Sequence, residues 1–418
     1  MKRVCVLTPG HLATNPRVVK EATALSDAGF DVTVVHGDYL PRARVVDAAL
    51  YDPRWTIRTV PFGPAQRSRL NYIAQTLRRR GARICARLNL NLNSSAPIAH
   101  APAVPGLAAA ACTVPADLYV AHYVAALPAA AGAARRHRAL YAFDAEDFHL
   151  GDLPDSPKHA FEKSLIRAIE AKVLPGAACI TADSAGVADA YAAEYAIARP
   201  TIVLNTFPKD QAPDGPTPRG RVVPGPTLYW FSQTIGPNRG LECALAAIRE
   251  ARTAPHLHLR GTPAKGYDAA LRQLAVALGV ADRLHIHPPD VPDEMARLAH
   301  TFDVGFSGEP GFSRNNTLSL GNKVFTYLLA GVPAVMSDVP AHVSFAAEAE
   351  GATFLFRAED PTSLANALDA LFENPDRLAN ARARAFALGQ ERFNWETESA
   401  TLLACVSRAL SATEHRTA

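Results

Sequence analysis

The feature that most constrains the fold is a regular alternation of short apolar, β-branched segments with longer amphipathic ones. In the first half the apolar segments are 3–8, 31–37, 117–122, 139–145, 178–183 and 201–207. Helical patterns lie between them, as in 16–29, where Val18, Ala22 and Leu25 share one face. Strands that alternate with helices form parallel sheets covered on both faces. The sequence therefore predicts a doubly wound α/β fold.

A proline- and glycine-rich segment divides the alternation into two parts. Residues 208–226 contain six Pro and three Gly, which predicts an interdomain linker. The alternation then resumes in segments 227–234, 256–261, 283–289, 303–308, 332–338 and 352–357. A length of 418 residues also favours two domains. We expect an N-terminal domain over 1–207, a C-terminal domain over 227–394, and a helix over 395–418 that crosses back.

Composition narrows the classes of binding partner and the cellular compartment that we expect. The net charge is only +3, which does not favour nucleic-acid binding. The six cysteines are scattered and none forms a CxxC pair, so neither a zinc site nor a disulfide framework is indicated. The chain enters its first predicted strand at once, without a signal-peptide pattern. The uncharged stretch 88–116 contains prolines that argue against a membrane span. We expect a cytoplasmic protein.

One segment is strongly basic. Between Pro53 and Ala116 there are nine Arg and no Asp or Glu. Its part 67–88 predicts a helix with five apolar residues roughly on one side: Leu70, Ile73, Leu77, Ile84 and Leu88. Two interpretations remain open. The segment is either a solvated helix packed on its domain, or a contact for the inner membrane surface or a polyprenyl diphosphate.

Ligands of open parallel sheets bind at the carboxyl ends of the strands. After the first strand, Gly10 allows close backbone approach, Asn15 predicts a helix cap, and Arg17 follows in the first turn. Arg17 is either a surface side chain or a contact for an anion or acceptor. Later strands end in His122 and in a run of charged residues: Asp144, Glu146, Asp147 and His149. Placing these charged groups side by side costs free energy, which favours a functional role for them. Their spacing only weakly indicates a metal ion.

In the C-terminal half, two cations fall near predicted helix starts. Arg239 precedes one helix, and Lys323 begins another within "TLSLGNKVFTYLLAG", 317–331, where the helix dipole disfavours it. Ser319 is the expected cap of the second helix. Arg260 is expected at the end of a neighbouring strand. Three cations that converge there would bind a diphosphate, assisted by backbone N–H groups of 319–323.

Several motifs resemble family-4, or group 1, glycosyltransferases of the GT-B fold. They are "NPRVVKEATALSDAGFDVTVV", "YAFDAEDF", "NRGLECALAAI" and "LSLGNKVFTYLLAGVPAVMSD". The resemblance implies two Rossmann-like domains that face a cleft, with C-terminal helices packing back across both. It implies a nucleoside-diphosphate sugar bound mainly by the C-terminal domain, an acceptor bound by the N-terminal one, and retaining transfer without metal or other cofactor.

The strand-end positions and the resemblance together assign roles to individual residues. The expected catalytic residues are His122, Asp144, Arg239 and Lys323. The expected donor-binding residues are Gly10, Ser232, Gln233, Arg239, Arg260, His287, Glu309, Leu318, Ser319, Asn322, Lys323 and Thr326. The expected acceptor-side residues are Asn15, Arg17, Glu146, Asp147 and His149. Thr326 stands where the family has a ribose-binding Glu, so the nucleotide preference is not carried over.

The function expected from this reasoning is glycosyl transfer, as in the synthesis of a polysaccharide, a glycolipid or a glycosylated metabolite. The expected partners are a nucleotide sugar and an unidentified acceptor. A lipid-linked acceptor is one candidate. Two alternatives remain: a non-catalytic subunit that binds a nucleotide sugar, and a GT-B sugar-nucleotide epimerase.

Overall fold

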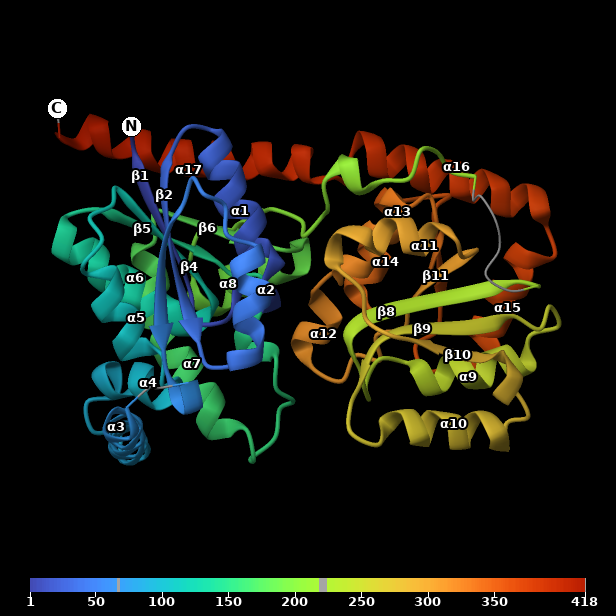
Figure 1. The fold of residues 1–418 in the computed structure, drawn as a ribbon, viewed down its shortest axis with the longest axis horizontal. Coiled ribbons are helices and arrows are strands. Elements are labelled where there is room, and N and C mark those ends of the chain that lie inside the picture. The colour runs from blue at the N-terminus through green and yellow to red at the C-terminus, as the bar shows by residue number, and fades with distance from the viewer. Residues whose placement is uncertain (66–67, 218–223, 418) are drawn as a thin grey trace. The chain divides into compact units, whose positions relative to one another are not determined.

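The computed structural model describes residues 1–65, 68–217 and 224–417, and divides the chain into two units. Unit 1 comprises Met1–Val203 and Ser399–Ala418, and unit 2 comprises Leu204–Glu398. Each unit is built on its own parallel sheet, as the sequence predicts (Figure 1). The C-terminal helix returns to complete unit 1.

The sheet of unit 1 has the strand order β3-β2-β1-β4-β5-β6-β7, and every pair is parallel. Its strands are β1 (Arg3–Thr8), β2 (Asp31–Asp38), β3 (Thr56–Pro61), β4 (Leu118–His122), β5 (Leu140–Asp144), β6 (Cys179–Ala182) and β7 (Thr201–Ile202). The order reverses between β1 and β4. At that switch point the loops after the two strands diverge to opposite faces and leave room for a ligand.

Helices surround this sheet and connect its strands. They are α1 (Pro16–Asp27), α2 (Arg44–Ala49), α3 (Arg69–Arg87), α4 (Leu92–His100), α5 (Val104–Ala111), α6 (Tyr123–His137), α7 (Ala160–Val173), α8 (Ala185–Tyr195) and α17 (Trp395–Thr417). Asn15 caps α1, as predicted, because its side chain accepts from the N–H of Val18. No described helix is both long and apolar enough to cross a membrane.

The sheet of unit 2 has the order β10-β9-β8-β11-β12-β13, again with only parallel pairs. Its strands are β8 (Thr227–Ile235), β9 (His256–Pro263), β10 (Leu284–His287), β11 (Val304–Ser307), β12 (Ala334–Ser337) and β13 (Thr353–Phe356). Its switch point lies between β8 and β11. One face of the sheet packs its leucines, Trp230 and Phe306 against α9 and α15, forming the core of the unit.

The helices of unit 2 are α9 (Leu241–Glu250), α10 (Tyr267–Ala277), α11 (Met295–His300), α12 (Arg314–Leu318), α13 (Asn322–Leu329), α14 (Pro340–Glu348), α15 (Pro361–Phe372) and α16 (Pro375–Glu391). As predicted, only helices follow Asp360. The described residues of the predicted linker 208–226 belong to unit 2. Pro216, for example, accepts a hydrogen bond from Arg382 Nε at 3.1 Å. Residues 218–223 lie outside the described part.

Two strands differ from the sequence prediction for physical reasons. β3 was not predicted, because it is an edge strand whose side chains are mostly exposed and show no apolar pattern. The apolar segment 201–207 forms only the two residues of β7. Beyond them the backbone bonds to the start of α17: the N–H of Leu204 donates to Glu398 Oε2 at 2.8 Å, and the carbonyl of Phe207 accepts from Trp395 at 2.9 Å.

Candidate functional site

In unit 2 the loops after β8 and β11 meet at the switch point. Gly240, at the start of α9, has φ +69°, and a Cβ there would lie 2.2 Å from the carbonyl oxygen of Gly308. Only glycine therefore allows the N-terminus of α9 to touch the end of β11. Glu309 follows directly after this contact, and Arg239 directly precedes it. The two side chains that the sequence predicted at separate strand ends are thus brought together.

Lys323 lies in the first turn of α13 and is only 7% exposed. Its Nζ is 3.4 Å from Glu309 Oε1 and 5.7 Å from the ring centroid of Trp230. The cap of this helix is Gly321, and the expected cap Ser319 instead ends α12, so that expectation was wrong. Within the described part of the chain, no side chain caps α13 or α9. Backbone N–H groups in the first turn of each helix thus lack a side-chain acceptor, although that of Val324 donates to the carbonyl of Gly321 at 3.2 Å.

Glu309 is the counterion of this group. Its Oε2 accepts from Asn316 Nδ2 at 2.8 Å and lies 3.9 Å from Arg239 Nη1. Burial alone would raise the pKa of Glu309, but Lys323, Asn316 and Arg239 outweigh burial and lower it. Both ion-pair distances are longer than those of a tight pair, which are about 2.7–2.9 Å. The guanidinium side chain of Arg239 is also 43% exposed. We call Arg239, Glu309 and Lys323 the unit 2 charge cluster.

Other expected donor residues lie differently. Ser232 and Gln233 fall at an irregularity within β8, where Ser232 is half-buried and Gln233 exposed. Arg260 lies inside β9, not at its end: it donates to Tyr229 Oη at 3.2 Å and to the carbonyl of Pro288 at 2.9 Å. Its guanidinium thus holds the loop after β10. It does not join the unit 2 charge cluster through any contact described in the structure.

The remaining expected positions of α12 and α13 are only partly accessible. Leu318, Ser319 and Asn322 are half-buried. Thr326 is buried, and its hydroxyl donates to the carbonyl of Asn322 at 3.3 Å, one turn back in its own helix. The hydroxyl that the sequence placed at the ribose is therefore engaged within the helix.

A ladder of four histidines was not predicted. His256 and His258 on β9 stack against His285 and His287 on β10, with ring centroids 4.4–5.2 Å apart. His258 Nδ1 and His287 Nε2 are 2.9 Å apart. Burial and the neighbouring histidines lower the pKa of His258 to about 3. The two-residue spacing in "HLHLRG" and "LHIHPP" was the available signal, since it puts all four rings on one face.

In unit 1 the charged residues at the strand ends form a closed network. Arg17 donates to both oxygens of Asp144, at 2.5 and 2.9 Å, and to the carbonyl of Val203 at 2.9 Å. Thr181 donates to Asp144 at 2.7 Å. Arg17 and Asp144 are buried, and this pairing lowers the pKa of Asp144 despite its burial. Arg17 is therefore a buried ion-pair partner and not a surface side chain.

His122 is the centre of the same network. Its Nδ1 is 2.9 Å from Glu146 Oε1 and 3.3 Å from Asp144 Oδ2, and its Nε2 is 2.7 Å from Glu21 Oε2. Burial disfavours a charged ring, but these carboxylates outweigh it and raise the pKa of His122 to about 10. The neighbouring carboxylates therefore favour the charged form of His122. We call Glu21, His122, Asp144, Glu146 and Arg17 the unit 1 charge network.

The other expected residues of unit 1 lie around this network. Asn15 donates to Glu146 Oε1 at 3.0 Å, which links the cap of α1 to it. Asp147 is half-buried, and its carbonyl accepts from Tyr191. His149 is buried, with Nδ1 3.3 Å from Asp152. Gly10 lies in the loop after β1, where its carbonyl accepts from Gly37.

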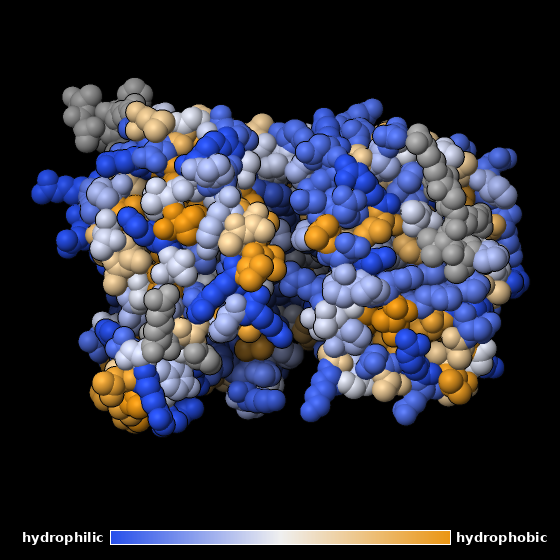
Figure 2. Space-filling view, in the orientation of Figure 1, coloured by the Kyte–Doolittle hydropathy of each residue, from blue (hydrophilic) through white to orange (hydrophobic). Residues whose placement is uncertain are grey.

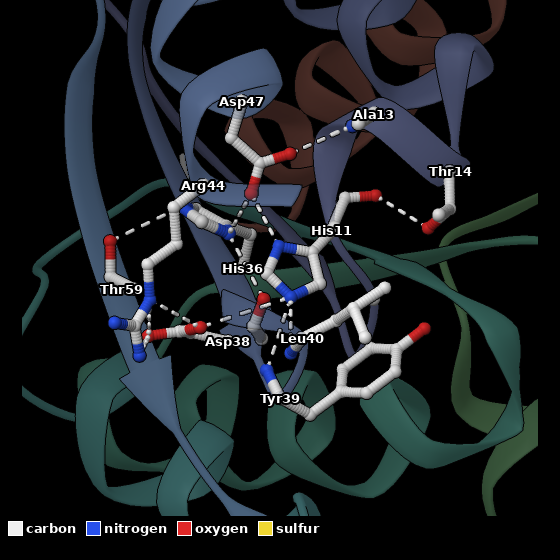
Figure 3. A network of polar contacts seen from close by, with 12 residues as sticks. His11, Ala13, Thr14, His36, Asp38, Tyr39, Leu40, Arg44, Asp47 and Thr59 are labelled. Carbon is white, nitrogen blue, oxygen red and sulfur yellow. Dashed lines mark hydrogen bonds and ion pairs between the residues drawn. The ribbon is translucent and has the colours of Figure 1, made fainter. Parts of the chain in front are cut away.

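A second histidine cluster lies near the start of the unit (Figure 3). His11, His36 and Asp47 are buried and close enough to hold a metal ion. However, His11 Nε2 accepts from the N–H groups of Tyr39 and Leu40, at 3.1 and 2.9 Å. Its proton must then lie on Nδ1, which donates to Asp47 at 2.5 Å. Both nitrogens of His11 are thus used by hydrogen bonds that a metal would have to break.

Glu21, His122 and Asp144 are also buried and close enough together to hold a metal ion. A metal bound there would take the place of the proton that His122 shares with Glu21 and Asp144, whose oxygens lie 2.7 and 3.3 Å from the ring nitrogens. Both clusters form internal ion pairs and hydrogen bonds.

Two Rossmann-like units, each built on a parallel sheet whose strand order begins 3-2-1-4-5-6, define the GT-B class of fold. Residues 225–374 match the sequence model of the family described as "Glycosyl transferases group 1". This match covers most of unit 2 and confirms the resemblance there. A comparison with curated proteins found no match.

Solved structures extend the likeness to nearly the whole chain. HepE of Anabaena, solved in complex with UDP, is 14% identical with TM-score 0.70, covering 97% of this chain and 100% of that one. Sucrose-phosphate synthase of Thermosynechococcus elongatus is 14% identical with TM-score 0.74, covering 99% and 100%. WaaG, a glycosyltransferase of lipopolysaccharide biosynthesis, is 12% identical with TM-score 0.63, covering 96% and 98%. At these identities the likeness shows the fold.

Proposed function

We propose that the protein transfers a sugar from a nucleoside-diphosphate donor to an acceptor, with retention of configuration and without a metal ion. The observation that carries this proposal is the unit 2 charge cluster. It places a buried lysine and a half-exposed arginine around one carboxylate at the switch point of the sheet. It also lies within the residues that match the glycosyltransferase family.

The chemistry of this cluster suits a diphosphate. Two cations around one carboxylate leave a net charge of +1, and the looseness of both ion pairs leaves their N–H groups able to bond elsewhere. The uncapped starts of α9 and α13 add backbone donors and a positive dipole end. UDP in the HepE structure supports a donor of this class.

In the proposed reaction, Lys323 and Arg239 stabilise the negative charge that develops on the leaving diphosphate. These two cations supply charge that a metal ion supplies in other phosphate-transfer sites. Glu309 is engaged by Lys323, Asn316 and Arg239, so we do not assign it the role of a covalent nucleophile. Retention then follows from attack on the face that the diphosphate leaves, with a phosphate oxygen accepting the proton of the acceptor.

We assign His122 and Asp144 a positioning role. Both are buried and their polar atoms face partners within unit 1. A charged network of this kind fixes the ends of β4 and β5, where the resemblance places the acceptor side. The acceptor itself is chosen by the groups around this network that remain half-exposed, such as Asp147.

A thermal-shift screen with UDP-, GDP-, ADP- and dTDP-sugars tests the donor class, because a ligand that binds only the folded state stabilises it. We expect the sugar conjugate of one nucleotide to raise the melting temperature of the protein. The corresponding nucleoside, which lacks the diphosphate, should not raise it. The same donor should be hydrolysed slowly without acceptor. Interconversion of nucleotide sugars would instead favour an epimerase, and binding without any turnover would favour a non-catalytic subunit. No shift with any nucleotide would contradict the proposal.

A further inference from the structure

Helix α3 has an unusual orientation on unit 1. The sequence predicted that its apolar residues share one side, and the structure shows that this side faces solvent. Leu77 is 61% exposed and Ile84 is 58% exposed. We define the α3 ridge as the exposed apolar residues Leu70, Ile73, Leu77, Ile84 and Leu88. An amphipathic helix ordinarily buries such a face in its own domain.

Polar side chains hold the opposite side of α3 on the domain. Gln75 Nε2 donates to the carbonyl of Pro102 at 3.0 Å. Arg79 Nε donates to the carbonyl of Ala99 at 3.3 Å, at the end of α4, where carbonyl groups lack partners within the helix. Arg83 pairs with Glu162 of α7, with Nη2 2.5 Å from Oε1. These contacts fix the helix with its apolar side outward.

The α3 ridge forms an apolar patch on the surface. Figure 2 shows hydrophobic residues gathered at the corner of the molecule where Figure 1 labels α3, with hydrophilic ones directly beside them. At 100° per residue, the five members of the ridge fall within about 60° of one another around the helix. Contiguous exposed apolar surface rimmed by charge marks an interaction site.

All charged residues of α3 are arginines. Arg69, Arg80 and Arg87 lie along one flank and Arg78 along the other, and all four are exposed. The sequence has no Asp or Glu from Pro53 to Ala116. Arginines on both flanks of a straight apolar row match the layered chemistry of a bilayer, in which anionic headgroups border acyl chains.

We propose that α3 docks unit 1 on the surface of a bilayer that contains anionic lipid. The ridge enters the boundary of headgroups and acyl chains, and the flanking arginines contact lipid phosphates. The helix, at 19 residues, lies in the plane of the surface and does not cross it. This inference does not depend on the proposed transferase activity, since it concerns only α3 and its attachment to unit 1.

Co-sedimentation of the full chain with phosphatidylcholine vesicles, with and without phosphatidylglycerol, tests the proposal. The chain should bind the anionic vesicles and bind neutral ones on the order of tenfold or more weakly, because each arginine near the surface strengthens binding about fivefold. Leu77→Glu with Ile84→Glu should lower binding to anionic vesicles on the order of tenfold or more. Arg78→Ala with Arg80→Ala should lower binding to anionic vesicles and reduce its salt dependence.

Helix α10 of unit 2 offers matched controls. Val276, which is 68% exposed, and Arg272, also exposed, lie on it. Val276→Glu and Arg272→Ala should each bind as the unchanged chain does. Equal binding to neutral and anionic vesicles, no binding to either, or full binding by the ridge variant would overturn the proposal. Self-association that the ridge variant abolishes, without vesicle binding, would assign the ridge to a contact between copies and also overturn it.

Discussion

The carboxyl ends of the two sheets carry similar charged residues but arrange them in opposite ways. In unit 1, Arg17, His122 and three carboxylates contact one another at 2.5–3.3 Å and are shielded from solvent. In unit 2, Lys323 and Arg239 approach one carboxylate only to 3.4 and 3.9 Å. The difference teaches that crowded charge does not identify a ligand site by itself. A ligand site needs charged groups that their protein partners hold only loosely.

The sharpest test of this contrast is Lys323→Ala. Loss of a cation that stabilises the leaving diphosphate should lower turnover by about 10³-fold. The fold should remain, because the ion pair that is lost is a loose one. The readout is the rate of donor hydrolysis together with the melting temperature. Lys265→Ala, at an exposed lysine of the same unit, is the matched control and should keep full activity. Activity within tenfold of the unchanged protein would remove Lys323 from the mechanism.

The corresponding test in unit 1 is the substitution Asp144→Asn. Because this change leaves Arg17 and His122 buried without their shared carboxylate, it should lower the free energy of unfolding by about 3–5 kcal/mol. Urea unfolding monitored in unit 1 measures it. Asp147→Asn, at a half-buried neighbour, should have a much smaller effect. If Asp144→Asn instead left stability unchanged and abolished activity, the network would be a working site and the contrast would fail.

His122 of unit 1 and His258 of unit 2 should contribute to the pH dependence of stability in opposite directions. His122 has a folded pKa of about 10, above the ordinary value of 6.5, so the folded state binds more protons between these values. The stability that it contributes is present below pH 6.5 and is lost as pH rises towards 10. His258 has a folded pKa of about 3, so its contribution is present above pH 6.5 and is lost as pH falls towards 3.

Urea unfolding of the two units across this pH range measures both slopes, each at most about 1.4 kcal/mol per pH unit for one proton. His258→Phe should flatten the acid slope of unit 2 and leave the alkaline slope of unit 1 unchanged. An acid slope that survives this substitution would show that other groups carry it.

The smallest expected effect is that of Thr326→Val. The Thr326 hydroxyl donates to its own helix and is buried, so its removal should change donor affinity by about twofold or less. Titration calorimetry with the nucleotide found by thermal shift measures this. Thr326→Ser, which keeps the hydroxyl, is the control. A tenfold loss in the Val variant alone would show that the hydroxyl reaches the nucleoside.

Most strands were readable in advance, because strands buried on both faces appear as short apolar runs whatever lies around them. The two exceptions are segments for which this condition does not hold. β3 is an exposed edge strand, and the segment after β7 bonds to α17, which begins nearly two hundred residues later. Arg260 was placed at a strand end because the pattern "HLHLRG" does not show that β9 continues to Pro263.

The sequence by itself determined the parallel α/β organisation, the lysine at the start of α13, and the single-sided apolar pattern of α3. These features depend on periodicity and on neighbours within a few positions. Only the tertiary structure decided that Arg17 is neutralised by Asp144 whereas Lys323 is held loosely, and that the apolar side of α3 faces outward. Ion pairing and burial are set through space, between residues such as 17 and 144 that local sequence patterns do not connect.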